Sequence, residues 1–288
     1  MVRKKQKPVL LIWKNVFTGM NINLGEQTMY KVYKNVEMTQ EGYLLGIEAE
    51  EASHSCAPGQ YFELKLPNDK HRVPVVLTDI LPERGIIKVV FRVINDSTKE
   101  LSELADGGNI EEIFGPFGRK CPFLNEDMEG KQALVIAEDL GGAAAYMIIH
   151  DLGKKGAVVD AVAGGRSEGY LYLSEFTGEL CRTYLNYSED GTQGEQGTIC
   201  QNIDDILTAE EYDICVIIGS IDMMEHVAAK AQSKGIKTWI SLDPAITSIK
   251  EYKTIDHVVI NGKEEKINEG GTVYEAAGVD FADLRKQI

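Results

Sequence analysis

The sequence is short of positive charge and has no paired cysteines. Its 288 residues carry 30 basic and 45 acidic side chains, a formal net charge of −15. Such a chain repels nucleic acid, so we expect no nucleic-acid partner; a basic surface on a partner protein fits its charge better. Five cysteines, odd in number and widely spaced, exclude a disulfide framework and favour reduced thiols in a cytoplasmic protein.

Long apolar runs are also missing. No stretch approaches the roughly 20 residues that span a bilayer, so we expect no membrane insertion. The basic start is followed by an apolar segment only from Pro8 to Trp13, which Lys14 ends, and this pattern does not predict a signal peptide. Hydrophobic residues nevertheless make up 43% of the chain, which is typical of a folded globular protein.

The length favours two domains. Residues 1–28 look like an N-terminal extension, and from 29 to 118 short alternating segments are separated by turn residues. Five or six strands at this spacing predict a small antiparallel β-barrel. A short helix should follow these strands, with Ser97 as its N-cap and Glu100 at capping-box spacing.

Residues 119–249 have a different pattern, in which apolar strands alternate with helical segments. This rhythm predicts an α/β Rossmann-like domain with a parallel sheet. We expect its helices near Gly142–Leu152, Gly197–Leu207 and Asp222–Lys234. Residues 250–288 form a mixed tail that ends in a short helix near Phe281–Lys286.

The stretch LVIAEDLGGAAAY, residues 134–146, reads as strand, tight turn and helix. In α/β proteins such a turn commonly holds a phosphate on backbone N–H groups at the helix start. Here the turn carries Glu138 and Asp139, two carboxylates where an anionic ligand would lie. The stretch therefore leaves open whether the chain binds a nucleotide or has lost this ligand.

Eight segments, taken in their order along the chain, indicate a protein family. They are APGQYFELKLP (57–67), RVPVVLTD (72–79), VFRVINDSTKEL (90–101), GPFGRKCPF (115–123), AGGRSEG (163–169), SEDGTQGEQG (188–197), YDICVIIGSIDMM (212–224) and GIKTWISLDP (235–244). As an ordered set the chain resembles the ferredoxin–NADP⁺ reductase superfamily, in particular its small flavin subunits of NADH-dependent ferredoxin–NADP⁺ oxidoreductase and of dihydroorotate dehydrogenase. The resemblance implies a β-barrel flavin domain followed by an α/β domain.

The resemblance also implies a site for FAD on the barrel. Arg72 and Pro74 match an R-x-P signature, in which Val73 lies between them and Val75 follows. The arginine would pair with the flavin pyrophosphate. The hydroxyl position of that signature falls on Val76, and Thr78 could replace it only partly. Without a ligand, Arg72 would be a surface arginine on a strand and Val76 would belong to the ordinary core of the barrel.

A second flavin element of the family, a glycine-x-Ser/Thr turn, falls on Asn95, Ser97 and Thr98. Asparagine replaces the glycine, and it is the residue that best tolerates positive φ after glycine. Asp96 adds a negative charge near two phosphates. The alternative is a capped helix start that needs no ligand.

The nucleotide side departs further from the family. The family's glycine triplet becomes Glu138-Asp139-Leu140, while Gly142 is kept. Arg166 matches an arginine of the family's G-x-R segment, and Gly219 keeps a later nucleotide-facing glycine. Two carboxylates near a pyrophosphate cost about 1 kcal/mol per charge pair at 4 Å in water. NAD(P)H binding is therefore doubtful.

The C-terminal module of the subfamily carries a [2Fe–2S] cluster on cysteines. In this chain no cysteine follows Cys215, and the ligand positions fall on Lys253, Asp256 and Asn268. Because such clusters require thiolates, we expect a degenerate module without a cluster. His54, Cys56 and His71 have no standard metal-site spacing, so no metal site is expected.

Two functions remain open. The first is an FAD-dependent electron-transfer subunit that passes electrons between a reduced donor and a partner protein, such as a larger flavoprotein or iron–sulfur subunit. The alternative is a non-catalytic paralogue that kept the fold as an assembly or regulatory subunit and binds NAD(P)H weakly or not at all. We expect no catalytic side chain in either case.

Overall fold

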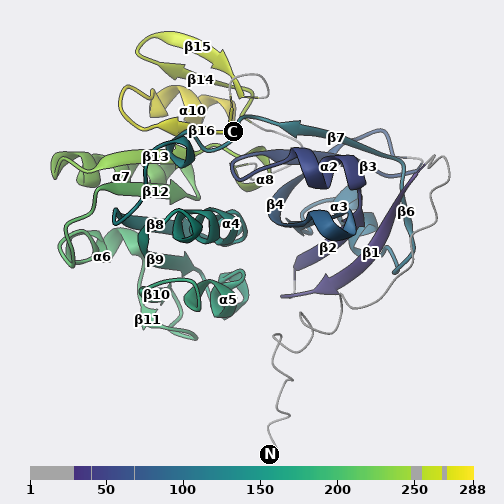
Figure 1. The fold of residues 1–288 in the computed structure, drawn as a ribbon, viewed down its shortest axis with the longest axis horizontal. Helices are drawn as coiled ribbons and strands as arrows, with labels where there is room; N and C mark the ends of the chain where they lie inside the picture. The colour runs from purple at the N-terminus through teal and green to yellow at the C-terminus, as the bar shows by residue number, and fades with distance from the viewer. Residues whose placement is uncertain (1–28, 40, 68, 248–254, 268–270) are drawn as a thin grey trace, which may run out of the picture.

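The computed structural model describes residues 29–39, 41–67, 69–247, 255–267 and 271–288. Two sheets form two lobes that lie side by side (Figure 1). The proposed extension, residues 1–28, lies outside the described part. Within the described part no helix is long and apolar enough to cross a membrane.

The first lobe is the predicted antiparallel barrel. Its sheet has the strand order β6-β1-β2-β5-β4-β3-β7. The strands are β1 (Tyr30–Glu37), β2 (Gly42–Glu48), β3 (Tyr61–Lys65), β4 (Val73–Leu81), β5 (Ile86–Arg92), β6 (Asn109–Ile110) and β7 (Glu112–Phe117). Alternate side chains of β2 to β5 point inward and form a closed apolar core, as the period of two predicts. The short helices α2 (Glu50–Ser55) and α3 (Asp96–Ser102) pack on this sheet.

Helix α3 begins two residues earlier than the sequence analysis placed it. The N-cap is Asn95 and not Ser97: the Asn95 side chain accepts from the Thr98 backbone N–H at 2.9 Å. The Thr98 hydroxyl in turn accepts from the Asn95 N–H at 3.0 Å. Asparagine caps helices about as well as serine, and Ser97 is instead buried.

The second lobe is the predicted α/β domain, with strand order β11-β10-β9-β8-β12-β13-β16. Five parallel pairings join β8 (Gln132–Glu138), β9 (Val158–Gly165), β10 (Thr183–Ser188), β11 (Glu195–Gln196), β12 (Ile214–Ile218) and β13 (Lys237–Ser241). Helix α4 (Gly141–Lys154) covers one face, and α6 (Ile199–Ile206) and α7 (Ile221–Ser233) cover the other. The three predicted helices are confirmed, whereas β10, β11 and the short α5 (Ser174–Gly178) were not predicted.

The tail continues the α/β sheet. Strand β16 (Val273–Glu275) pairs antiparallel with β13, while β14 (His257–Ile260) and β15 (Lys263–Lys266) form a separate hairpin. The final helix α10 (Phe281–Gln287) confirms the predicted one and buries Leu284. The four-residue α8 (Pro244–Thr247) follows β13 and lies against β4 of the barrel.

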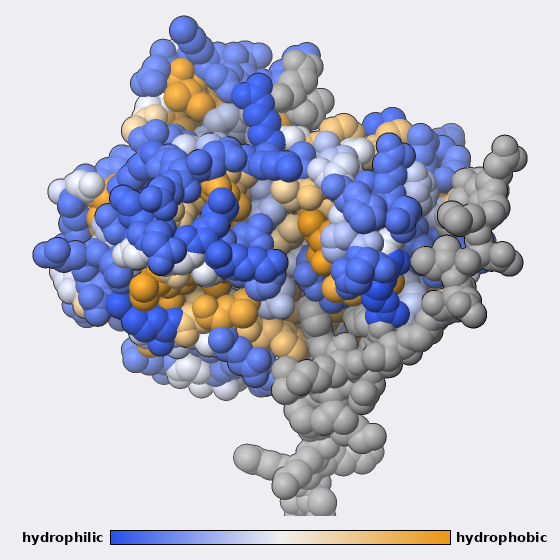
Figure 2. Space-filling view, in the orientation of Figure 1, coloured by the Kyte–Doolittle hydropathy of each residue, from blue (hydrophilic) through white to orange (hydrophobic). Residues whose placement is uncertain are grey.

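The two lobes meet along an apolar seam. Leu44, Val76 and Val90 of the barrel pack against a group from the α/β domain, which consists of Leu140, Ala143, Tyr172, Leu173 and Phe176. Figure 2 shows hydrophilic residues over most of the visible face, with apolar residues gathered on the lower part of the α/β lobe and between the lobes. The seam thus fixes how the two domains face each other.

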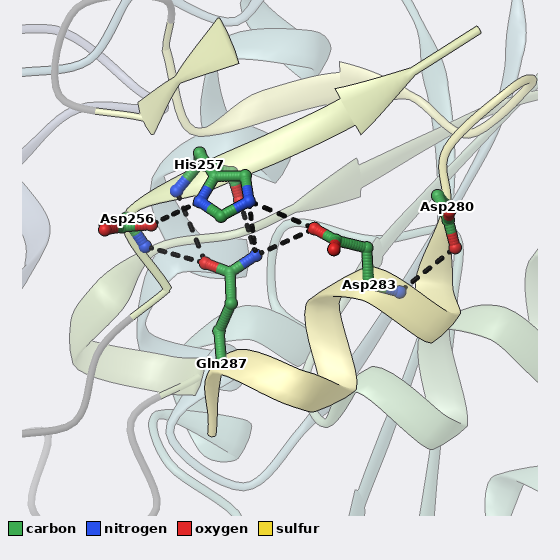
Figure 3. A network of polar contacts seen from close by, with 5 residues as sticks. All are labelled: Asp256, His257, Asp280, Asp283 and Gln287. Atoms are coloured by element: carbon green, nitrogen blue, oxygen red, sulfur yellow. Dashed lines mark hydrogen bonds and ion pairs between the residues drawn. The ribbon is translucent and has the colours of Figure 1, made fainter. Parts of the chain in front are cut away.

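A polar network ties helix α10 to strand β14 (Figure 3). The His257 ring contacts the Asp256 carboxylate and lies 3.1 Å from that of Asp283. The Gln287 amide oxygen accepts from the Asp256 backbone N–H at 3.1 Å, and its amino group donates to the His257 carbonyl at 3.2 Å. The hydrogen bond to Asp256, with the nearby carboxylates, raises the pKa of His257.

We expect the docking of α10 to weaken as the pH rises. A histidine whose pKa is raised on folding stabilises the fold fully below its unfolded value of about 6.5, and this contribution is lost as the pH passes the folded pKa. Hydrogen exchange of the α10 amides should therefore show less protection at pH 8 than at pH 6. In His257→Gln this pH dependence should disappear, whereas the exposed His226→Gln should retain it; equal pH profiles of His257→Gln and wild type would contradict the assignment.

Candidate functional site

A pocket of about 440 Å³ opens on the barrel where β4, β5 and α3 approach the α/β domain. Its volume lies in the range of small-molecule and cofactor sites. Its lining combines cations, an apolar wall and one carboxylate. The lining residues are Glu63, Lys70, His71, Arg72, Val73, Pro74, Phe91, Arg92, Ile94, Asn95, Thr98, Leu140 and Ala245.

Five of the site residues predicted from the sequence meet in this pocket, although two separate segments supply them. Arg72, Val73 and Pro74 come from the start of β4, and Asn95 and Thr98 from the start of α3. Val75 points into the barrel core and is fully buried. Ser97 is buried and its side chain is hydrogen-bonded to Asp69.

Arg72 lies at the mouth of the pocket and is half-exposed. Its guanidinium stacks 3.5 Å above the centre of the Phe114 ring and lies 3.6 Å from the Glu63 carboxylate. A planar guanidinium held against an aromatic face keeps its hydrogen-bond donors in one plane, suited to a phosphate group. The structure therefore places Arg72 as an accessible, partly oriented cation.

Sequence reasoning missed the second arginine of the pocket. Arg92 ends β5, and its guanidinium donates to the Asp139 carboxylate of the α/β domain at 2.6 Å. Burial raises the pKa of the Asp139 carboxyl. The positive charges of Arg92 and Arg166 oppose this shift but do not cancel it. A signal was present, because Arg92 is the one charge inside the apolar run VVFRVI (89–94), three residues before the predicted flavin turn begins at Asn95.

The conformation of Asn95 differs from the expectation. Its φ of −155° is extended backbone and not the left-handed region that glycine would favour. Its side chain caps α3 instead. The replacement of glycine by asparagine therefore needs no tolerance of positive φ; the N-cap role alone accounts for the residue.

Val76 and Thr78 both face the domain seam. Val76 is fully buried in the apolar cluster at the seam. The Thr78 hydroxyl donates to the Ala143 carbonyl of α4 at 2.7 Å and is fully buried. Thr78 therefore joins the two domains, and its hydroxyl does not replace the one missing at Val76.

The glycine pair of the turn LGG packs against protein backbone. A Cβ on Gly141 would lie 2.5 Å from the Ile218 carbonyl oxygen, and a Cβ on Gly142 would lie 2.7 Å from that of Tyr172. Positive φ in this turn falls on Asp139, at 53°. Close packing is thus one reason for both glycines, and a ligand role for Gly142 stays a prediction.

Arg166 and Gly219 lie outside the barrel pocket. Gly219 forms the turn after β12, where a Cβ would be 2.6 Å from the Met223 methyl carbon. Arg166 follows β9 and stacks 4.1 Å above the Tyr170 ring. Both lie beside the carboxyl ends of the parallel strands, where the sequence placed the nucleotide side.

The predicted cluster positions fall partly outside the described residues. Lys253 and Asn268 are among the residues not described, and the Asp256 carboxylate contacts His257. Within the described ranges no group of three or more His, Cys, Asp or Glu side chains is placed to hold a metal ion. All five cysteines are free, and burial raises the pKa of each thiol.

The residues of the barrel pocket fit FAD. Lys70 and Arg72 supply positive charge for a pyrophosphate in a chain that is otherwise strongly acidic, and Arg92 adds donors although it is paired with Asp139. Val73, Pro74 and Leu140 supply an apolar wall for a ring system. Glu63 is the one acidic lining residue, and Arg72 lies beside it.

The fold and pocket define a two-domain protein of the ferredoxin reductase-like class. No model of a known protein family matches the chain. It is 25% identical over 265 residues, 92% of each chain, to a dihydroorotate dehydrogenase B (NAD(+)) electron transfer subunit homolog of Thermotoga maritima. The predicted resemblance to the ferredoxin–NADP⁺ reductase superfamily is thereby confirmed.

Solved structures agree on the fold. One, of an NADH-dependent reduced ferredoxin-NADP oxidoreductase, superimposes with a TM-score of 0.78 at 24% identity and covers 92% of this chain and 94% of its own. Another is a ferredoxin NADP⁺ reductase of Neisseria gonorrhoeae with bound FAD and NADP, with a TM-score of 0.58 at 14% identity, covering 72% of this chain and 91% of its own. The predicted barrel plus α/β architecture is confirmed.

Proposed function

We propose that this protein is an FAD-binding electron-transfer subunit of a larger redox complex. The observation that carries the proposal is the cationic pocket on the barrel, which gathers Arg72, Pro74, Asn95 and Thr98 from two separate segments. The likeness to an electron transfer subunit over 92% of both chains supports it. Bound FAD would supply the redox chemistry.

The protein's own residues would bind and orient this cofactor. Arg72 and Lys70 at the mouth would hold phosphate oxygens, and Arg92 would bring a third cation to the inner end. The capping box of Asn95 and Thr98 keeps the start of α3 rigid beside the pocket. The buried seam on Leu140 would exclude water from the inner end.

A partner protein would exchange electrons with this subunit, and a cytoplasmic location fits the reduced cysteines. We propose no cluster, because no cysteine follows Cys215. We propose no direct NAD(P)H site, because Glu138 and Asp139 place two carboxylates in the turn and bind groups of the protein itself. The alternative, a non-catalytic assembly or regulatory subunit, differs in one measurable respect, which is the flavin content.

The test is FAD binding by the full chain. We expect the purified protein to have a flavin absorption spectrum, to release FAD on denaturation, and to hold one FAD per chain. Arg72→Ala should weaken FAD binding by roughly ten- to a hundredfold, since a hydrogen bond to a charged group contributes about 1.5–3 kcal/mol.

Arg84→Ala is the matched control, because Arg84 also stacks on an aromatic ring, that of Tyr33, but lies outside the pocket. It should bind FAD like wild type. A colourless protein that takes up no added FAD would overturn the proposal and favour the non-catalytic alternative. Equal losses in both arginine variants would remove Arg72 from the site.

A further inference from the structure

The carboxyl ends of β8 and β12 border the place where the strand order of the α/β sheet reverses. From β8 the chain continues to β9 and β10 on one side, and β12 and β13 lie on the other. In open parallel sheets ligands bind in the crevice at such a switch point. Helix α7 begins at this crevice, with Ser220 as its N-cap.

One carboxylate of the chain already lies at this switch point. Glu138 ends β8, and its Oε2 accepts from the Ser220 hydroxyl at 2.6 Å and from the Ser220 backbone N–H at 3.2 Å. A Cβ on Gly219 would lie 2.8 Å from the Glu138 Cβ, so the glutamate packs directly on the turn before α7. Glu138 thus binds donors that face the crevice and covers the turn.

A second carboxylate, that of Asp222, lies in the first turn of α7. Burial, with the carboxylates of Glu138 and Asp222, raises the pKa of the Cys200 thiol on α6. Arg285 contacts Asp222 from α10. Arg166, which follows β9, is stacked on Tyr170 and acts on Asp139.

The neighbouring Asp139 points the other way. Its carboxylate forms an ion pair with Arg92 of the barrel across the seam. Asp139 therefore contacts the other domain, whereas Glu138 contacts Ser220 within its own domain. At the start of α7 Glu138 is thus the carboxylate bound to Ser220, while Asp222 in the first turn is paired with Arg285. This separation allows the effect of Glu138 on a ligand to be measured without breaking the contact between the domains.

We propose that Glu138 takes the place of a nucleotide's anionic group at the start of α7 and thereby excludes dinucleotides from the crevice. The residue is a specificity determinant: it supplies the negative charge that the Ser220 donors would otherwise offer to a ligand. The inference does not depend on FAD binding, because the crevice and the barrel pocket share none of these residues.

The experiment is calorimetric titration of the full chain with ADP-ribose and with NADH. We expect wild type to bind both with a Kd above about 1 mM. Glu138→Gln keeps an oxygen for Ser220 but removes the charge, and should lower the Kd at least about fivefold. Glu138→Ala also removes the bulk and should lower it further.

Glu211→Gln is the control for net charge, because exposed Glu211 precedes β12 at the opposite edge of the sheet. Its Kd should equal that of wild type. A lower Kd in Glu138→Ala alone would support the proposal, because it would show that the bulk of the Glu138 side chain blocks the ligand. Tight binding of either ligand by wild type would overturn the proposal. So would an unchanged Kd in both Glu138 variants when their thermal unfolding is also unchanged. The flavin content of each variant is measured separately.

Discussion

Replacing Gly141 with alanine should destabilise the protein by about 3 kcal/mol, at the upper end of the usual cost of overpacking. The new Cβ would lie 2.5 Å from the backbone oxygen of Ile218 and 3.0 Å from its carbonyl carbon. Neither atom belongs to a side chain that can rotate away. Helix α4 would have to move off β12 at the point where Asp139 and Leu140 reach the barrel.

Gly153 in the same helix is the matched control. It is exposed, and an added Cβ there would meet nothing within 4 Å. Gly153→Ala should stabilise the protein by about 0.5–1 kcal/mol, because alanine loses less backbone entropy in a helix. Urea unfolding of both variants measures the contrast. Equal effects would show that the glycine at 141 is not required by packing.

Asp243→Asn should stabilise the protein strongly at pH 8 and little at pH 4. Asp243 precedes α8, is 5% exposed, and accepts a hydrogen bond from the Ala245 backbone N–H at 2.9 Å. Burial raises the pKa of its carboxyl to about 7, although the Ala245 hydrogen bond lowers it. The folded state therefore favours the neutral carboxylic acid.

The sign follows from linkage between folding and protonation. The unfolded pKa is about 3.9, so the stabilising effect of the neutral form is complete below that pH and is lost as the pH rises to about 7. Three units correspond to roughly 4 kcal/mol as an upper bound. The asparagine amide keeps an oxygen for the Ala245 N–H but carries no charge at any pH.

The measurement is the difference in unfolding free energy between variant and wild type at pH 4, 6 and 8. We expect this difference to grow between pH 4 and 7 and then to level off. The exposed Glu211→Gln should show a difference near zero throughout. A difference for Asp243→Asn that does not change with pH would show that Asp243 ionises normally in the folded protein.

Pattern and composition determined the architecture from the sequence. Alternation with a period of two gave the barrel strands, and apolar runs separated by helical segments gave the parallel sheet, because these periods follow directly from backbone geometry. The elements β11 and α5 were missed because two and five residues are too few to show a period. Strand β10 was missed because its sequence TYLNYS lacks the continuous apolar run of the other parallel strands. The assignment of Ser97 as N-cap was wrong because Asn95, two residues earlier, accepts the capping hydrogen bond from the Thr98 N–H.

The sequence predicted only part of the barrel pocket. Residues next to each other in a motif, such as Arg72 and Pro74, could be assigned to the barrel pocket. Arg92 and Leu140 could not, because their place depends on how the second domain lies against the first. The same holds for Thr78, whose hydroxyl is bound to a carbonyl 65 residues further along the chain.

The two carboxylates of the turn show the division most clearly. The sequence by itself determined that Glu138 and Asp139 stand at the end of a buried strand, where a nucleotide-binding turn would have glycines. Only the tertiary structure decided that Glu138 reaches Ser220 and that Asp139 reaches Arg92. Local periodicity sets the element on which a side chain lies. The partner of a charge, by contrast, is set by which distant segments the packing of two domains brings within hydrogen-bond reach.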